Sequence, residues 1–220
     1  MGRRGKGDPL ARKDLRTAAP CRSGLPRVQR AFGVLIPGRI DMDFPDLVKR
    51  RFSLRKYSTG PVPDELIEQC LEAARLAPSA CNSQPWTFLI ARTPEKTESL
   101  AKAAFSGIYS MNSFASRAPV LITVITERSR YSASLGGLFR GVQFSLMDVA
   151  IACEHIALQA AELGLGTCMY GWFDEKAVRR ELGLPSGAKI DIMLSLGYPA
   201  EGVTVPPKNR KVMDEIRRYL

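Results

Sequence analysis

Histidine and paired cysteines are scarce in this chain of 220 residues. The only histidine, His155, lies in an apolar predicted helix, where we expect a hydrogen-bonded core residue. The five cysteines form no C-x-x-C pair: Cys21, Cys70, Cys81, Cys153 and Cys168. The chain therefore has too few histidines and paired cysteines for a metal cluster or a Ser-His-Asp triad, and no metal site is expected. An odd number of cysteines suits reduced thiols in a cytoplasmic protein, which is the location we expect.

Long apolar runs and a nucleotide-binding glycine motif are also missing. No apolar run approaches the length of a membrane span, and no charged segment leads into a long apolar one, so a secretion signal is not supported. No G-x-G-x-x-G follows a predicted strand, because the GLG at 164–166 follows a helix and lacks the third glycine. The sequence therefore predicts no Rossmann dinucleotide-binding domain.

The formal charge of +10 is concentrated at the N-terminus. Residues 1–41 hold ten basic and three acidic residues, a net of +7, which leaves +3 for residues 42–220. The N-terminal segment is rich in Gly, Pro and Arg without helical or strand periodicity, so we expect disorder. It could be a tail for nucleic acid or a membrane surface, a transit peptide, or sequence upstream of the true start. The domain-like beginning at Met42 favours the last.

Two polar stretches stand out in the body of the chain. Arg51, Ser53 and Arg55 alternate along an extended segment, so their side chains share one side, and two guanidiniums with a hydroxyl suit a phosphate ester. Residues 79–84 form a small polar turn in which Asn82 and Gln84 could hydrogen-bond a flat heterocycle. The plainer interpretation is a solvated basic turn followed by an ordinary loop, with Cys81 in a packing role.

The periodicities predict helices mixed with strands in non-alternating order, which indicates an α+β domain. Helices are expected at 43–51, from 64 to an end at Pro78, at 93–105, 142–163, 174–182 and 212–219, and strands at 86–91, 119–126, 166–171 and 188–197. Ile190, Ile192, Leu194 and Leu196 alternate in the last strand and should share a face. The helix at 142–163 is apolar nearly all round, so one side should face a second subunit.

Residues 105–141 form an aromatic region of weak periodicity. Its aromatic residues are Phe105, Tyr109, Phe114, Tyr131 and Phe139. A lid that contacts substrate and loosely packed surface would both have this pattern.

Four motifs together resemble those of one flavoprotein family. They are R-x-S-x-R-x-Y at 51–57, APSACNSQPW at 77–86, ELGLGTCMYGWFDE at 162–175 and PPKNR at 206–210. Their order over 42–220 resembles the nitroreductase family. The resemblance implies a nitroreductase-like α+β fold, with a central antiparallel or mixed sheet surrounded by helices in an intertwined homodimer. FMN would lie at the interface, bound partly by each subunit, with the C-terminal arm crossing onto the partner.

The implied reaction is a ping-pong hydride transfer from NADH or NADPH through FMN to an electron-poor small molecule, such as a nitroaromatic or a quinone. The matched motif positions imply that Arg51, Ser53, Lys208 and Arg210 hold the FMN phosphate, and that Arg55 stabilises charge at the pyrimidine edge. Chemistry would occur on the flavin rather than on a catalytic side chain. The implied cofactor-binding residues are Arg51, Phe52, Ser53, Arg55, Asn82, Gln84, Tyr170, Gly171, Trp172, Lys208 and Arg210.

Other functions stay open because a fold does not fix a reaction. The same fold hosts dehalogenases, azoline oxidases, ene-type reductases and a flavin-cleaving enzyme. Residues 105–141 show no acidic-tyrosine-lysine lid of the deiodinase kind. From a different class, the protein could be a non-catalytic flavin- or nucleic-acid-binding module that uses its basic tail, although we expect neither a nucleic-acid nor a membrane partner.

Overall fold

The computed structural model describes residues 42–127 and 141–220. The helical elements are α1 (Phe44–Arg50), α2 (Asp64–Arg75), η1 (Ala80–Asn82), α3 (Pro94–Ala104), η2 (Gly107–Arg117), α5 (Phe144–Glu162), α6 (Glu175–Glu181) and α7 (Met213–Ile216). The strands are β1 (Trp86–Ala91), β2 (Val120–Thr126), β3 (Gly166–Tyr170) and β4 (Ile190–Gly197). The expected α+β class is confirmed, and the tail at 1–41 lies outside the described residues.

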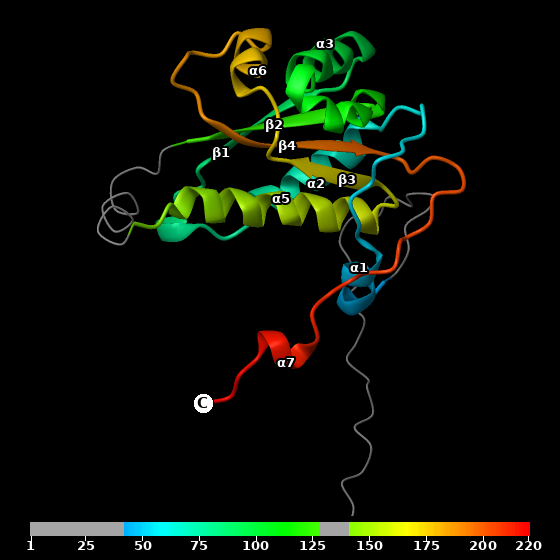
Figure 1. Cartoon of the computed structure of the whole chain (residues 1–220), viewed down its shortest axis with the longest axis vertical. Coiled ribbons are helices and arrows are strands. Elements are labelled where there is room, and N and C mark those ends of the chain that lie inside the picture. Colours follow the sequence, from blue (N-terminus) through cyan, green and yellow to red (C-terminus); the bar gives the residue numbers. More distant parts are fainter. Residues whose placement is uncertain (1–41, 128–140) are drawn as a thin grey trace, which may run out of the picture. The chain divides into compact units, whose positions relative to one another are not determined.

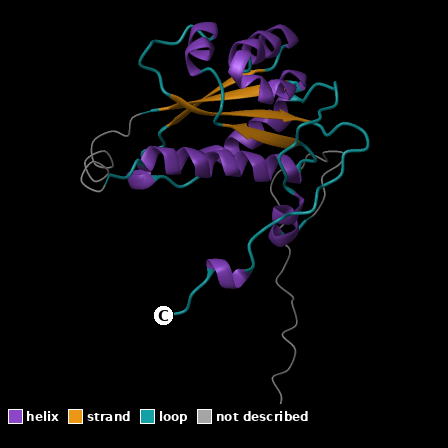
Figure 2. Cartoon of the chain, viewed as in Figure 1, coloured by secondary structure: helices purple, strands orange, loops and turns teal. Residues whose placement is uncertain are grey.

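The strands form one antiparallel sheet in the order β1-β2-β4-β3. Helices cover both faces: α2 and α5 lie on one side, and α3, η2 and α6 lie on the other (Figures 1 and 2). Each face has its own core, because alternate side chains of β2 point to opposite sides. Ile122 and Val124 pack with α2 and α5, whereas Leu121 packs with α3 and η2.

Three helices begin as their sequences predict. The side chains of Asp43, Thr93 and Asp174 each accept a hydrogen bond from a backbone N–H in the first turn of α1, α3 and α6. Such caps satisfy N–H groups that have no partner within the helix. The predicted start of α3 at Thr93 and Pro94 is therefore confirmed.

The predicted common face of β4 is wrong at one residue. Ile192, Leu194 and Leu196 pack against the core of α2 and α5, but Ile190 packs in the opposite core. The register between β2 and β4 shifts here: Val124 pairs with Ile192, and the next residue pairs with Ile190. A bulge of this kind turns one side chain to the other face, which alternation in a single strand does not reveal.

Helix α5 has one buried and one exposed apolar side. Ala152, Cys153 and Ile156 are fully buried against the sheet, whereas Met147 is 56% and Ile151 is 38% exposed. By length and composition alone α5 could cross a membrane, so the expectation that no apolar run approaches that length was wrong. Its contacts with α2, β2, β3 and β4 make it the core helix of this sheet.

The aromatic region is more structured than its sequence suggested. Residues 107–117 form the 3-10 segment η2, and Phe105 is 4% exposed, with its ring centroid 5.1 Å from that of Tyr170. Phe105 is therefore a core residue, so neither a lid nor loosely packed surface describes this position. Tyr131 and Phe139 lie outside the described residues.

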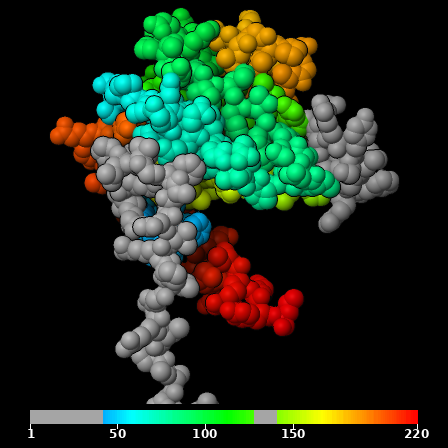
Figure 3. Space-filling model, turned by 180° about the vertical axis from the view of Figure 1, so that it is seen from behind, coloured from blue at the N-terminus to red at the C-terminus, as the bar shows by residue number. Residues whose placement is uncertain are grey.

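The C-terminal segment has little cover within this chain. Pro206 and Pro207 stand in the expected extended arm, but α7 spans only Met213–Ile216. Residues 209–220 are all exposed, and the segment projects from the surface (red in Figure 3). The apolar residues predicted for a helix at 212–219 are thus more than half exposed within the described residues.

The cysteines and the histidine mostly lie as expected. Cys70 and Cys153 are buried, and burial raises the pKa of each thiol to about 12. Cys81 is exposed, so its expected packing role was wrong. His155 Nδ1 lies 2.9 Å from the carbonyl oxygen of Ala73, as expected of a hydrogen-bonded core histidine. Within residues 42–127 and 141–220 no group of His, Cys, Asp and Glu could hold a metal.

Replacing Gly166 by Ala is expected to destabilise the fold by about 1–3 kcal/mol. A Cβ at this position would lie 2.6 Å from Leu54 Cδ2 and 2.8 Å from Leu54 Cβ, and Leu54 is fully buried. Thermal denaturation measures the loss. Gly187→Ala provides the control, because a Cβ there would meet nothing within 4 Å; an equal loss in both variants would contradict the steric explanation.

Candidate functional site

The segment that carries the basic motif lies along the β3 edge of the sheet. Ser53 forms a parallel bridge with Thr167, and the Leu54 N–H donates to the Thr167 carbonyl at 2.8 Å. Leu54 points into the core, while Ser53 and Arg55 are exposed. The extended alternation predicted for this segment is therefore present.

Residues from the two ends of the described chain meet at Arg51. The Lys208 ammonium donates to the Val48 carbonyl at 2.9 Å and to the Arg51 carbonyl, so it caps the C-terminus of α1. Burial lowers the pKa of Lys208, and the nearby charges of Arg51 and Arg210 lower it further. Lys208 therefore lies within electrostatic reach of both arginines, and such a group of cations would attract a phosphate dianion.

One acidic side chain in this cluster was not predicted from the sequence. Glu154, on the exposed side of α5, lies with Oε1 3.5 Å from Arg51 Nε. Its charge also acts on Lys208. Only the fold brings Glu154 here, since about a hundred residues separate it from Arg51 in the chain.

Glu154→Gln is therefore expected to tighten the binding of a phosphate ligand by roughly two- to fivefold, because a partly exposed charge pair is worth little. Fluorescence titration with FMN at low and at high salt measures the gain, which should shrink as salt screens the charge. Unchanged or weaker FMN binding would show that Glu154 does not repel the phosphate.

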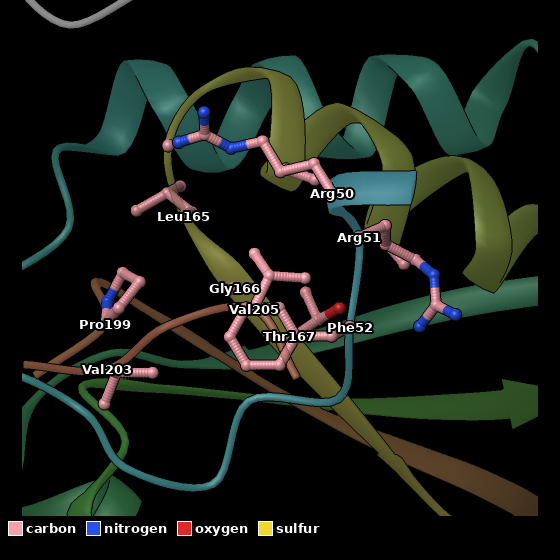
Figure 4. Close-up of a pocket in the computed structure, with 12 residues that line it drawn as sticks. Arg50, Arg51, Phe52, Leu165, Gly166, Thr167, Pro199, Val203 and Val205 are labelled. Atoms are coloured by element: carbon pink, nitrogen blue, oxygen red, sulfur yellow. The ribbon is translucent and has the colours of Figure 1, made fainter. Parts of the chain in front are cut away.

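A small cavity adjoins the basic cluster (Figure 4). Its volume is about 160 Å³, smaller than the 300 Å³ or more that enclosed ligand sites usually have. In Figure 4 the side chains of Arg50 and Arg51 extend to opposite sides of the segment. The lining residues are Arg50, Arg51, Phe52, Ala157, Ala161, Gly164, Leu165, Gly166, Thr167, Pro199, Val203 and Val205.

Arg55 lies near the end of β3 that carries the Tyr170–Trp172 turn. Its guanidinium carbon is 5.9 Å from the centroid of the Phe114 ring, and that ring is 5.8 Å from the Tyr170 ring. Tyr170 is 2% exposed, so its side chain supports the turn from the core of the protein. Gly171 is exposed, and no atom lies within 4 Å of a Cβ built on it, so its backbone is open to a ligand.

The Trp172 side of this turn is joined to η2. Trp172 Nε1 donates to the Ile108 carbonyl at 3.3 Å, and Asn112 Nδ2 donates to the Trp172 carbonyl at 3.0 Å. The rings of Tyr109 and Trp172 lie 5.1 Å apart. These contacts were not predicted, and they hold a half-exposed indole beside Gly171.

The polar turn at 79–84 has a strained backbone. Cys81, Asn82 and Gln84 have positive φ values of 53°, 53° and 46°. Such conformations are rare outside glycine, cost about 1–3 kcal/mol each, and gather at functional sites. Gln84 Nε2 donates to Asn82 Oδ1 at 3.1 Å, so the two predicted amides are paired and exposed.

Asp148 holds this turn in place. Its two carboxylate oxygens accept from the Ala80 N–H at 3.1 and 3.2 Å, and the side chain is almost fully buried. The Ser79 hydroxyl adds a second anchor, because it accepts from the Gln84 N–H at 2.9 Å. Neither anchor was predicted from the sequence.

Within one chain, Asn82 and Gln84 do not meet the basic cluster. The polar turn contacts α5 at Asp148, whereas Arg51 contacts it at Glu154, about 9 Å further along the helix axis. The turn leads into β1 at one edge of the sheet, and Ser53 lies beyond β3 at the other edge. Three strand spacings separate these edges by about 14 Å.

Comparison with known proteins identifies the family. The profile of the nitroreductase family matches residues 48–110 and 109–198. The chain belongs to the nitroreductase family. The family predicted from the four motifs is thus confirmed, and its matched span includes all the predicted site residues except Lys208 and Arg210.

Other nitroreductase-family proteins and relatives resemble this one over most of its length. An NADH dehydrogenase of Thermus thermophilus is 32% identical, covering 73% of this chain and 88% of its own. Iodotyrosine deiodinase 1 of Rattus norvegicus is 27% identical, covering 79% and 68%. The structure of an FMN-dependent nitroreductase of Clostridium difficile is 29% identical, with a TM-score of 0.58 and coverage of 73% and 90%.

Proposed function

We propose that this nitroreductase-family protein is an FMN-dependent oxidoreductase that takes hydride from NADH or NADPH and reduces an electron-poor acceptor, such as a nitroaromatic or a quinone. The observation that carries the proposal is the hydrogen bond from Lys208 to the Arg51 carbonyl, which joins the basic C-terminal segment to an edge segment that also presents Arg55. The names of its relatives, an NADH dehydrogenase and an FMN-dependent nitroreductase, support the same reaction class. Bound FMN would supply the hydride chemistry, in a ping-pong cycle.

The donor set fits a flavin mononucleotide. Arg51, Lys208 and Arg210, with the Ser53 hydroxyl, offer charge-assisted hydrogen bonds to a phosphate dianion. Phe52 follows Arg51 and packs partly into the core, which fixes the direction of the segment.

Two groups near the end of β3 would serve the ring. Arg55 would stabilise negative charge at the pyrimidine edge, because a fixed cation costs no reorganisation when charge develops. The open backbone at Gly171 can approach a planar ring closely, with Trp172 beside it.

We further propose that two chains complete each site. Leu146, Met147, Ala150 and Ile151 form an exposed stripe on α5 at helical spacing. A homodimer would cover this stripe and bring Asn82 and Gln84 of one chain to the basic cluster of the other. The exposed segment beyond Arg210, at the end of the C-terminal arm, would cross onto the second subunit.

The protein is expected to purify yellow, to lose its flavin absorbance with NADH or NADPH, and to regain it with a nitroaromatic or a quinone. A colourless protein that binds no FMN would overturn the proposal. A flavoprotein that no nicotinamide reduces would be the non-catalytic binding module.

Reductive dehalogenation is the second candidate, because the deiodinases are relatives. Residues 107–117 contain Tyr109 but no acidic residue and no lysine, which disfavours a deiodinase-type lid in this segment. A panel of nitroaromatics, quinones and iodotyrosine as acceptors decides between them. Faster turnover of iodotyrosine would reassign the reaction and leave the cofactor proposal intact.

We also propose that the catalytic domain begins at Met42 and works in the cytoplasm without a nucleic-acid or membrane partner. Cys70, Cys81, Cys153 and Cys168 are free thiols, which suits a reducing compartment. Deleting residues 1–41 is expected to leave FMN content and turnover unchanged. A loss of flavin in the shortened protein would show that the boundary is misplaced.

A further inference from the structure

Three buried hydroxyl groups form a chain beneath the segment that carries Arg55. The Tyr57 hydroxyl donates to the Leu54 carbonyl at 2.7 Å and lies 2.5 Å from Ser195 Oγ. The Tyr170 hydroxyl lies 2.7 Å from the same Ser195 oxygen. Ser195 is 0%, Tyr170 2% and Tyr57 7% exposed, so solvent does not replace these bonds.

The donor-to-acceptor direction of these hydrogen bonds follows from counting the protons of the three hydroxyl groups. The Leu54 carbonyl can only accept, so the Tyr57 proton is committed to it. Ser195 then donates its own proton to the Tyr57 oxygen, which lies much nearer than its other acceptor, the Cys168 carbonyl at 3.5 Å, and Tyr170 donates to Ser195. Burial raises the pKa of both tyrosines, so they remain neutral donors. The result is a single relay from Tyr170 through Ser195 and Tyr57 to the Leu54 carbonyl.

The relay ends on the backbone that positions the ligand-facing side chains. The Leu54 N–H is bonded to the Thr167 carbonyl at 2.8 Å, so both polar groups of this residue are fixed. Its chain neighbours are Ser53 and Arg55, which therefore have little freedom at their backbone. At its other end the relay begins at Tyr170, whose next residue is the exposed Gly171.

We propose that Ser195 is a positioning residue that fixes Arg55 relative to the Gly171 turn, and thereby sets how strongly the site favours reduced over oxidised flavin. Ser195 lies on β4, opposite Cys168 of β3, and touches neither Arg55 nor Gly171 in the contacts of the described chain. It acts through Tyr57 on one side and through Tyr170 on the other. This role rests on the proposed function, since it presumes that a flavin binds between Arg55 and Gly171.

The first test needs no flavin. Hydrogen exchange of the Leu54 amide, measured by NMR on the flavin-free protein, should accelerate roughly three- to tenfold in Ser195→Ala and by at least as much in Tyr57→Phe, the range expected for one hydrogen bond. Tyr170→Phe keeps the bonds between Ser195, Tyr57 and Leu54, so it should change this amide least.

The second test measures the flavin itself. In the FMN-loaded protein, Ser195→Ala should shift the midpoint potential of the bound flavin to a more negative value, because a less fixed Arg55 stabilises the reduced form less. Tyr170→Phe should also make the midpoint potential more negative, because Tyr170 holds the neighbouring Gly171 turn. The affinity of Ser195→Ala for reduced FMN should fall roughly three- to tenfold more than its affinity for oxidised FMN.

Thr123→Val is the matched control. Thr123 is a fully buried residue of the neighbouring strand β2, and its hydroxyl has no hydrogen-bond partner within the described residues. Removing that hydroxyl should change neither the Leu54 exchange nor the potential. If Thr123→Val shifts both as much as Ser195→Ala does, Ser195 has only a general structural role and the proposal fails.

Each remaining outcome is also decisive. If Ser195→Ala leaves exchange and potential unchanged, the relay does not position the site. If Ser195→Ala does not fold, Tyr57→Phe carries the exchange test, and Tyr57→Phe and Tyr170→Phe carry the potential test. If the wild-type protein binds no FMN, the proposed function fails and the flavin role of Ser195 fails with it, whereas the exchange result still shows whether the relay holds Leu54.

Discussion

Ile151→Asp is expected to turn the protein into a monomer that retains no FMN through purification. Ile151 and Met147 lie one turn apart on the exposed side of α5, where we place the second subunit. A carboxylate buried at an apolar interface without a partner is strongly destabilising, and the twofold symmetry of a dimer introduces it twice. Because Asn82 and Gln84 would come from the partner, loss of the dimer should remove their contacts with the flavin.

Sedimentation at low micromolar concentration, with flavin absorbance recorded on the same sample, measures both effects. Wild-type protein should sediment at twice the chain mass with flavin bound. Ile108→Asp is the control, because Ile108 is 75% exposed but lies on η2, away from α5, and this variant should remain dimeric. A well-behaved FMN-loaded monomer, in wild type or in Ile151→Asp, would contradict the two-chain site.

Arg51→Ala and Arg210→Ala should each weaken FMN binding by roughly ten- to a hundredfold. Each charge-assisted hydrogen bond to the phosphate is worth about 1.5–3 kcal/mol, and about 1.4 kcal/mol corresponds to a factor of ten. Lysine at either position should recover only part of the loss, because it keeps the charge but not the bidentate geometry.

Riboflavin, which lacks the phosphate, separates binding from folding. Its weaker affinity should barely change in the same two variants when the flavin-free protein is titrated with both flavins. Arg75→Ala is a matched control: it also breaks an arginine–carboxylate pair, with Glu72 at 2.6 Å, but on an exposed helix surface. If Arg51→Ala and Arg210→Ala weaken riboflavin as much as FMN, these residues support the fold and do not bind the phosphate.

Local patterns in the sequence were enough to predict most of the elements. Caps at Thr93 and Asp174 and the stop at Gly164, which has a φ of 76°, lie where side-chain chemistry or glycine freedom requires them. Ile190 could not be placed, because its face depends on a register shift against a strand far away in the chain. Phe105 was assigned to a possible lid because its core contact with Tyr170 is equally non-local.

The residues of the candidate site likewise fall into those that local patterns predict and those that only distant contacts place. Arg51, Ser53 and Arg55 could be predicted from their alternation, because an extended segment fixes the side to which each residue points. Glu154, Asp148 and Ser195 could not, since each acts on a residue more than sixty positions away. Ordinary serine or acidic residues within a helix or strand carry no local signal of such a role.

Anaerobic mixing of the FMN-loaded protein with NADH or NADPH tests the central claim most directly. The account predicts that the yellow absorbance bleaches in a single turnover, and that a nitroaromatic or a quinone added afterwards restores it. A protein that binds FMN at Arg51 and Arg210 but stays yellow with both nicotinamides would contradict the assignment as an NAD(P)H-dependent oxidoreductase.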